Sequence, residues 1–273
     1  MKFLTTAVLV MIAGLASGLT SARAQQQPAA QPPAQTAPAP DLGLKVEIEP
    51  AAMALVKAMS DKLAAAKSMS FTAIAAYESP DRTGLPLSYA TRSDVTMQRP
   101  DKLKVITPGD GPRTEFYYNG KTVQAYEPSA KLVAFVDAPD TTDAMLRAAF
   151  QRAAIYFPFT DLIVTDPMKA IAENLRVAFV VGKSMVVARE PTDIVVLVGK
   201  FVHVQLWIGS EDKLPRMAQA IFLEDPARYR HIVRFSDWKL DPALAADTFT
   251  FTPPAGTTRI PFVPPGAVAP AKK

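Results

Sequence analysis

Hydrophobic residues recur at every second position through most of this chain, the pattern of β-strands that bury one face. In the first half such runs cover residues 71–78, 85–99, 103–107, 114–118, 122–126 and 131–136. They resume at residues 177–181, 185–189, 192–198, 202–208, 217–224 and 229–239. Asn119 and Gly120 form the residue pair favoured in two-residue hairpin turns. The pattern therefore predicts an antiparallel meander of about a dozen strands.

Two parts of the chain depart from this period and predict helices. After Pro50, apolar residues recur at spacings of three and four and form one stripe, consisting of Ala52, Leu55, Val56, Met59, Leu63 and Ala66. Residues 144–156 are rich in helix formers, and residues 168–175 follow Pro167. We therefore predict a mainly β (α+β) fold, with an N-terminal helix against the sheet and a mid-chain helical lid over a curved sheet.

The two ends of the chain have the composition of segments outside a folded domain. Lys2 precedes an apolar stretch over residues 3–19, and residues 22–24 have the small-x-small pattern of a secretory cleavage site. A transmembrane anchor is the alternative, but Thr5, Thr6 and Ser17 interrupt the stretch. We predict a signal peptide at 1–24, a disordered Pro/Gln/Ala linker at 25–41, a domain at 42–262 and a disordered tail at 263–273.

The composition limits which cellular compartment and which classes of binding partner we expect for this protein. The chain has no cysteine, so it has neither a disulfide nor a cysteine for lipid attachment after a signal peptide. Loss of residues 1–24 would remove Lys2 and Arg23 and lower the formal charge from +4 to +2. This charge is too small to indicate nucleic acid binding. The short signal peptide favours a Gram-negative periplasm, and we expect a monomer.

The sequence offers little for catalysis. The only histidines are His203 and His231, and no metal-ligand spacing is present. His231 alternates in phase with apolar neighbours, which favours a core position over a catalytic one. Ser184 lacks the second glycine of a nucleophile elbow. The spacing of Asp137, Asp140 and Asp143 favours an acidic turn over a calcium loop. We therefore expect no enzymatic activity, no metal and no cofactor.

Arg99 is the most informative single residue of the predicted sheet. It shares strand parity with Leu87, Tyr89, Val95 and Met97, so it projects from the same face as these apolar side chains. A guanidinium stays charged, and burying it without partners is costly. Whatever covers this face must supply hydrogen-bond acceptors to Arg99. The sequence thus predicts a covered cavity in which Arg99 forms one charged contact with the covering element. We call this contact the latch.

Several short runs carry a family resemblance over residues 50–262. The sequences MQRP at 97–100, NGKT at 119–122, YEP at 126–128 and FTFTPP at 249–254 resemble the periplasmic lipoprotein-carrier proteins of Gram-negative bacteria. The runs at 204–208, 214–216 and 235–238 are more similar to an uncharacterised family of predicted periplasmic proteins thought to share that fold. The resemblance implies an incomplete, curved antiparallel β-barrel that is closed by helices and receives acyl chains in its apolar hollow.

The resemblance also suggests which residues bind a ligand. Arg99 takes the latch role and bonds carbonyls of the covering helices, with the mid-chain insertion as the expected source. Leu103 and Val105 match wall positions, where smaller aliphatic residues replace the aromatic residues of the carriers. The lid helix contributes Met145 and Phe150, which either fill the hollow or give way to a ligand. The further candidates are Phe116, Val123 and Trp207, the last being either a stacking residue or a core residue.

These observations predict a periplasmic carrier or chaperone for lipid, lipoprotein acyl chains or another hydrophobic ligand. The alternative is an envelope sensor or interaction module that uses the same half-barrel to bind a protein partner. A hydrolase is the third hypothesis.

The linker generates a testable prediction. Deleting residues 25–40 should leave the melting temperature of the exported protein nearly unchanged, because a segment of Gln, Pro, Ala and one Thr buries almost no apolar area. Thermal unfolding of the deleted and full-length proteins measures this. A large drop in melting temperature would show that the segment docks on the domain.

Overall fold

The computed structural model of the chain describes residues 47–108 and 113–264. The predicted signal peptide and linker lie outside the described residues, as does the tail from residue 265.

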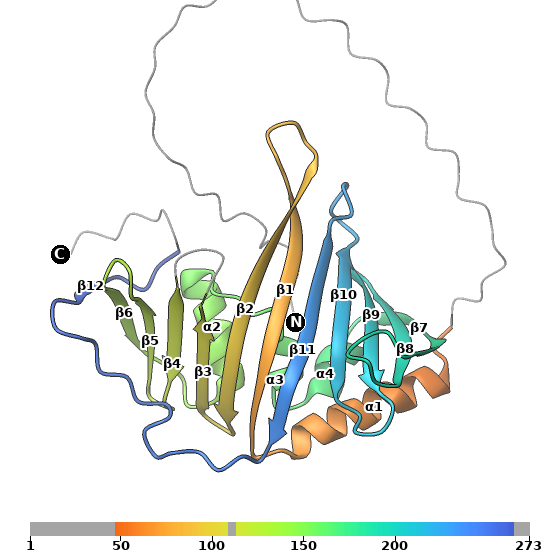
Figure 1. Ribbon diagram of the computed structural model, residues 1–273, viewed down its shortest axis with the longest axis horizontal. Helices are drawn as coiled ribbons and strands as arrows, with labels where there is room; N and C mark the ends of the chain where they lie inside the picture. Colours follow the sequence, from red (N-terminus) through yellow and green to blue (C-terminus); the bar gives the residue numbers. More distant parts are fainter. Residues whose placement is uncertain (1–46, 109–112, 265–273) are drawn as a thin grey trace, which may run out of the picture. The chain divides into compact units, whose positions relative to one another are not determined.

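Twelve strands form a single sheet in the order β12-β6-β5-β4-β3-β2-β1-β11-β10-β9-β8-β7 (Figure 1). The first six strands are β1 (Ser68–Pro80), β2 (Pro86–Gln98), β3 (Lys102–Thr107), β4 (Thr114–Tyr118), β5 (Thr122–Glu127) and β6 (Leu132–Asp137). The others are β7 (Leu175–Ser184), β8 (Thr192–Gly199), β9 (Val202–Gly209), β10 (Pro215–Phe222), β11 (Arg230–Leu240) and β12 (Thr258–Ile260). The sheet is not closed into a barrel, and its edges are β7 and β12.

The sheet consists of two antiparallel meanders joined at the centre. Strands β1 to β6 follow one another as neighbours, and so do β7 to β11. The first and last of these eleven strands meet, so that Ala73 of β1 pairs with Phe235 of β11. The short β12 departs from this pattern, because it pairs in parallel with β6. The predicted mainly β fold with an open antiparallel sheet and covering helices is thus confirmed.

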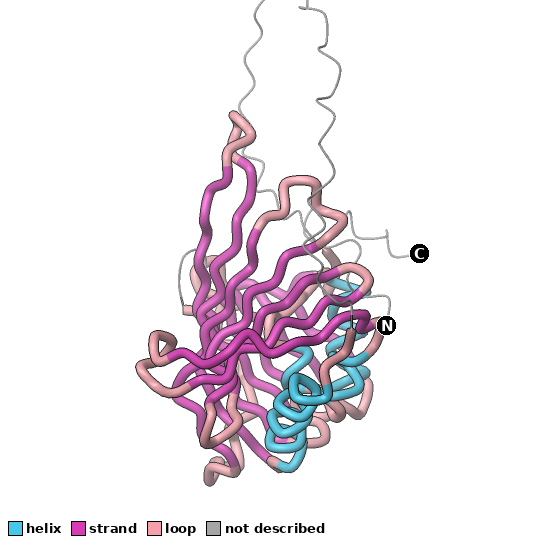
Figure 2. The backbone as a smooth tube through the Cα atoms, turned by 90° about the vertical axis from the view of Figure 1, so that its right-hand side faces the viewer, coloured by secondary structure: helices cyan, strands magenta, loops and turns pink. Residues whose placement is uncertain are grey.

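The helices lie on one face of the sheet, which we call the inner face (Figure 2). They are α1 (Pro50–Ala65), α2 (Thr142–Ala153), α3 (Thr160–Ile163) and α4 (Pro167–Ala172). Helix α1 begins with Pro50 and buries Ala52, Val56, Met59 and Leu63, which belong to the stripe expected from the sequence. Helix α2 begins after Thr141, whose side-chain oxygen accepts a hydrogen bond from the Ala144 N–H.

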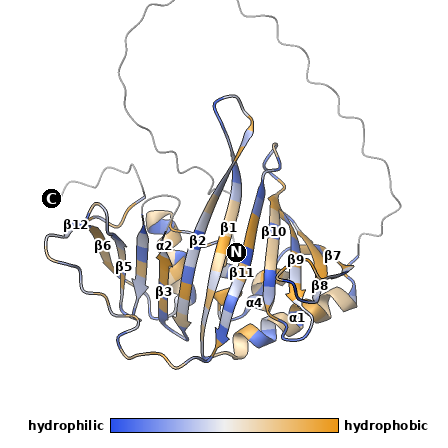
Figure 3. Cartoon of the chain, viewed as in Figure 1, coloured by the Kyte–Doolittle hydropathy of each residue, from blue (hydrophilic) through white to orange (hydrophobic). Residues whose placement is uncertain are grey.

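The inner face and the helices enclose one apolar core. Alternation along each strand sends one set of side chains inward, and Figure 3 shows apolar and polar positions alternating along the strands. Met69, Met97 and Leu103 are fully buried on the sheet side of this core, and Met59 and Ile163 are fully buried on the helix side. Burial of these side chains against the sheet holds the helices in place.

The structure corrects two predictions and contains two elements that the sequence did not predict. The strand expected at 185–189 is absent, because Ala188 and Arg189 have φ values of 57° and 58°, in the left-handed region that a strand does not contain. Helix α3 and strand β12 were not predicted. The turn after β4 contains three residues rather than two, because the Asn119 side chain accepts hydrogen bonds from the N–H groups of Lys121 and Thr122 at 3.0 Å.

The last described part of the chain crosses from the sheet centre to its edge. We call residues 249–262 the C-terminal strap. Within it Phe251 stacks on Tyr117, with ring centroids 4.7 Å apart. The Thr258 N–H donates to the Lys131 carbonyl at 2.8 Å, which begins the pairing of β12 with β6. The strap thus covers the edge of the sheet that β6 would otherwise expose.

The core generates a prediction about stability. Phe159 is 1% exposed and its ring lies edge-on to Phe71 with centroids 5.4 Å apart. Phe159→Ala should lower the free energy of unfolding by about 3–5 kcal/mol, because it leaves a cavity under the helices. The matched control is Phe179→Ala on edge strand β7, where the side chain is 37% exposed. The expected loss there is below about 1 kcal/mol. Urea unfolding measures both, and equal losses would contradict this picture of the core.

Candidate functional site

Five of the predicted ligand-binding residues come together on the inner face. Strand β3 contributes Leu103 and Val105, β4 contributes Phe116, β5 contributes Val123, and α2 contributes Met145 from the opposite side. Each is at most 5% exposed, and Val105 pairs directly with Phe116 in the sheet register. We call these five residues the inner-face cluster. Three adjacent strands and the helix above them bring these five residues together.

Aromatic side chains that sequence reasoning missed fill the space over the inner-face cluster. Phe157 and Phe159 precede α3, and their rings stack at 5.4 Å. The ring of Phe157 also lies edge-on to Phe116, with centroids 5.3 Å apart. The sequence signal was the Phe-Pro-Phe run at 157–159, between the two predicted helices of the insertion. In this structure the apolar hollow is therefore occupied by the protein's own side chains.

Arg99 follows β2 and lies half-buried beneath α1. Its Nη2 donates to the Leu63 carbonyl at 3.4 Å, and its backbone N–H donates to the Lys67 carbonyl at 2.8 Å. The Nε atom is buried and has no hydrogen-bond partner among the described residues. Burial lowers the pKa of Arg99, and the charge of Asp143 opposes this shift. The acceptor of the latch thus belongs to α1 and not to the mid-chain insertion, where it was expected.

Pro100, the residue after Arg99, binds α2, the second of the helices that cover the sheet. The Pro100 carbonyl accepts hydrogen bonds from the backbone N–H of Thr142 at 2.8 Å and from its hydroxyl at 3.0 Å. Nearby, the Tyr118 hydroxyl donates to the Pro139 carbonyl at 2.6 Å, and burial raises the pKa of Tyr118 to about 12. These bonds all lie at the N-terminal end of α2. The sheet therefore holds α2 by polar contacts at one end.

Two predicted residues lie apart from the inner-face cluster. Trp207 alternates along β9 with Leu206 and Ile208, which are buried in the core, so it projects from the outer face of the sheet. Phe150 is half-buried on α2 and lies outside the core cluster of the described residues. The sequence signal for this placement is the alternation along residues 202–208, where Val202, Val204, Leu206 and Ile208 share one face and Trp207 shares the other with His203 and Gln205.

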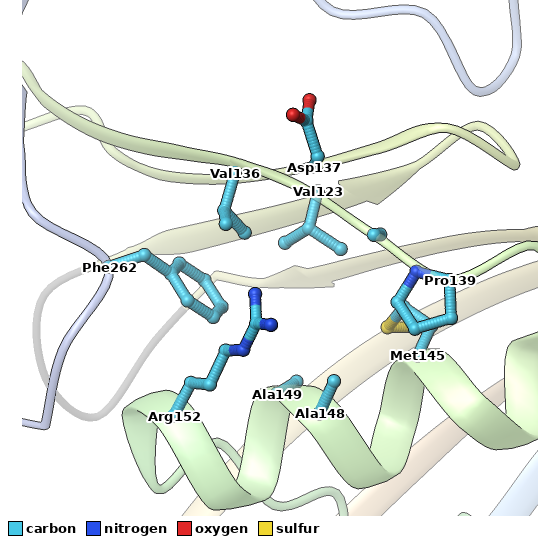
Figure 4. A pocket seen from close by; sticks show the side chains of 10 residues that line it. Val123, Val136, Asp137, Pro139, Met145, Ala148, Ala149, Arg152 and Phe262 are labelled. Atoms are coloured by element: carbon cyan, nitrogen blue, oxygen red, sulfur yellow. The ribbon is translucent and has the colours of Figure 1, made fainter.

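A narrow crevice opens between α2 and strands β5 and β6 (Figure 4). Its volume is about 10 Å³, which is close to the least that holds one water molecule. The lining residues are Val123, Val136, Asp137, Ala138, Pro139, Met145, Ala148, Ala149, Arg152 and Phe262. We call this space the α2 crevice. It leads from the surface to Val123 and Met145, two members of the inner-face cluster.

The β1–β2 hairpin extends the apolar surface beyond the rest of the sheet (Figure 1). Leu85 is 65% exposed, and Leu87 and Tyr89 are each 46% exposed. The ring of Tyr89 stacks on Tyr77 at 5.5 Å, and His231 of β11 stacks on the same tyrosine at 6.2 Å. Burial lowers the pKa of His231, which keeps this imidazole neutral at physiological pH. We call Leu85, Leu87 and Tyr89 the hairpin patch.

The described residues contain no group of three or more His, Asp or Glu side chains placed to hold a metal ion. Within residues 47–108 and 113–264, no helix has the length and apolar character of a membrane span.

Comparison with known proteins identifies the family. Residues 52–263 match the model of a family described as predicted periplasmic protein (DUF2092), which confirms the family resemblance seen in the sequence. No curated protein matches the chain. An uncharacterized conserved protein from Thermus thermophilus is similar, with a TM-score of 0.45 and 10% identity over 77% of this chain and 99% of that chain.

Two further solved structures are similar to the chain. LprF from Mycobacterium bovis has a TM-score of 0.45 and 15% identity, over 74% of this chain and 99% of that chain. A LolA superfamily protein from Nitrosomonas europaea has a TM-score of 0.36 and 12% identity, over 72% of this chain and 97% of that chain.

The geometry of Arg99 predicts the effect of replacing it. Arg99→Met should raise the free energy of unfolding by about 1 kcal/mol, because it removes a half-buried charge that has only one long side-chain hydrogen bond among the described residues. The control Lys102→Met removes a positive charge from the first residue of β3, where the ammonium lies 3.5 Å from an Asp101 carboxylate oxygen, and should lower the free energy of unfolding by less than about 1 kcal/mol. Chemical denaturation measures both variants. A loss of stability in Arg99→Met alone would contradict this expectation, because it would mean that the folded protein satisfies the guanidinium better than water does.

Proposed function

The chain belongs to a family of predicted periplasmic proteins, and we propose that it is a periplasmic carrier or chaperone that binds a hydrophobic ligand between its sheet and its covering helices. Lipids and the acyl chains of lipoproteins are the ligand class that fits the apolar inner face. The single observation that carries the proposal is the inner-face cluster, an apolar wall covered by separate helices rather than by a second sheet.

The way the covering helices are attached supports ligand exchange. Helix α2 is fixed to the sheet by hydrogen bonds at its first turn, through Thr142 and Pro100. Further along α2, apolar side chains such as Met145 and Leu146 are buried, and apolar contacts of this kind are non-directional and reform after displacement. Methionine in particular adapts to irregular apolar partners. An apolar ligand can therefore replace Met145, Phe157 and Phe159 over the wall without breaking a polar network.

The proposal assigns no catalysis and no cofactor to this site, because its members carry no titratable or nucleophilic group. It also treats the protein as a monomer. One sheet edge is already protected, since Ile48 bridges to Ala178 of β7 and the Glu49 carboxylate accepts the Val180 N–H at 2.9 Å. A covered edge does not recruit a second chain by strand addition.

A second function is favoured by the hairpin patch. Exposed aliphatic and aromatic side chains on a protruding hairpin are typical of protein interaction sites. An envelope protein partner could bind Leu87 and Tyr89 while the inner face stays filled. In that case the half-barrel acts as an interaction module and not as a carrier.

Two measurements test the carrier proposal. Native mass spectrometry of the full chain, exported and purified from the periplasm, should show a co-purifying lipid. The apolar dye 1-N-phenylnaphthylamine should bind the purified protein, and Val105→Glu should weaken this binding at least about tenfold because it places a carboxylate on the apolar wall. Val181→Glu is the matched control, since Val181 is 51% exposed on β7 and its replacement should leave dye binding unchanged.

The outcome separates the two functions. Absence of both a lipid and dye binding in the unmodified protein would overturn the carrier proposal. A stable complex with an envelope protein that Leu87→Asp abolishes would then establish the interaction module.

A further inference from the structure

We propose that the α2 crevice is the entrance to the inner face and that it binds the anionic head group of a single-chain amphiphile, a fatty acid, on Arg152. This inference rests on the proposed function and adds the chemistry of the ligand to it. The geometry that carries it is one face of α2 in which an apolar stripe ends in a cation.

The stripe follows from helical spacing. Met145, Ala148, Ala149 and Arg152 lie at positions i, i+3, i+4 and i+7, so they share one face of α2, and all four line the crevice. Met145 is fully buried and Arg152 is exposed, so the stripe runs from the core to solvent over about 10 Å of helix. The two alanines between them present only methyl groups to Val123 and Val136, so that the space opens along this stripe once Phe262 is displaced. This is an acyl-chain path with a positive charge at its outer end.

Arg152 is available for a ligand. It forms no hydrogen bond or ion pair with another described residue, whereas Arg92, Arg113 and Arg216 each bind a carboxylate. Figure 4 shows Arg152 extending from α2 toward the strands, with its guanidinium beside the ring of Phe262. The carboxylate of Asp137, the acidic residue of the lining, points away from α2 in the same view. A guanidinium in this position fits a carboxylate, which it can bind with two parallel hydrogen bonds.

Phe262 occupies the place that the acyl chain would take. Its ring is half-buried, packs against the core and lines the crevice between α2 and β6. It lies two residues beyond β12, a strand of only three residues that are all exposed. The strap here is held by Thr258 on Lys131 and by a 3.3 Å bond from Arg259 Nη2 to the Phe135 carbonyl. Phe262 is thus an apolar plug just beyond a three-residue edge strand, and an incoming acyl chain replaces it with like chemistry.

The way in which α2 is attached to the sheet also allows Phe262 to be displaced. Its polar bonds to the sheet lie at Thr142, at the end of the helix away from the crevice mouth. The C-terminal end, which carries Arg152, contacts the sheet through the crevice. Movement of this end widens the path to the inner-face cluster while the first turn stays bound to Pro100.

The test compares two fluorescent ligands that differ only in the head group, cis-parinaric acid at neutral pH and its methyl ester. The full chain purified from the periplasm and stripped of lipid should bind the acid about tenfold more tightly than the ester, as expected for one charge-assisted contact. Arg152→Gln should abolish this preference by weakening the acid alone. Arg147→Gln, on the same helix but outside the crevice lining, is the matched control and should keep the preference.

A second variant tests the plug. Phe262→Ala should tighten binding of both ligands by about fivefold, because the ligand no longer competes with the ring. Equal binding of acid and ester, unaffected by Arg152→Gln, would overturn the head-group site while leaving the carrier proposal intact. Unchanged affinity in Phe262→Ala would overturn the plug. Failure of both ligands to bind any of these proteins would overturn the carrier proposal together with this inference.

Discussion

The turn between β2 and β3 joins both covering helices to the sheet. The Arg99 guanidinium donates to Leu63 in the last turn of α1, and its backbone N–H donates to Lys67, two residues beyond the helix. Pro100 accepts two hydrogen bonds from Thr142 in the first turn of α2. An open sheet with an apolar inner face has to be covered, and a chain without cysteine has no disulfide with which to fix the cover. Arg99 and Pro100 therefore determine where the two covering helices are attached to the sheet, and apolar contacts add to this attachment.

The covering helices are held to the sheet by two kinds of contact, fixed and exchangeable, and this difference underlies the proposed role of the inner face. The bonds at the β2–β3 turn are directional and local, whereas Phe157, Phe159 and Met145 cover the wall by contacts that have no strict geometry. Gly120 shows how close the packing is at the fixed end, because a Cβ atom there would collide with a carboxylate oxygen of Asp101. Directional hydrogen bonds thus fix the covering helices at the β2–β3 turn, whereas the apolar contacts over the middle of the inner face can be replaced by those of a ligand.

The fold was predictable from the sequence because its strands alternate and its first helix has one apolar stripe. The inward position of Arg99 followed from the same alternation, whereas the wall at Leu103 and Val105 was suggested by a family resemblance. The partner of Arg99 could not be predicted, since a backbone carbonyl acceptor leaves no trace in residue identity. The outer position of Trp207 was predictable, because it shares strand parity with His203 and Gln205 and not with the apolar positions of β9. Helix α3 is too short for a periodic signal, and β12 depends on pairing with a strand far away in the sequence.

The pairing of β1 with β11 has a consequence for how the protein matures. Each meander pairs strands that are neighbours in the sequence and can form as soon as its own strands are available, but the central seam needs the two ends of the domain. A chain exported with its N-terminus first presents β1 with a bare edge and an uncovered apolar face until β11 has crossed the inner membrane. During that interval the bare strand edge and the apolar face of the half-formed sheet favour aggregation in the envelope. The seam between β1 and β11 is therefore the step at which folding of this sheet competes with aggregation.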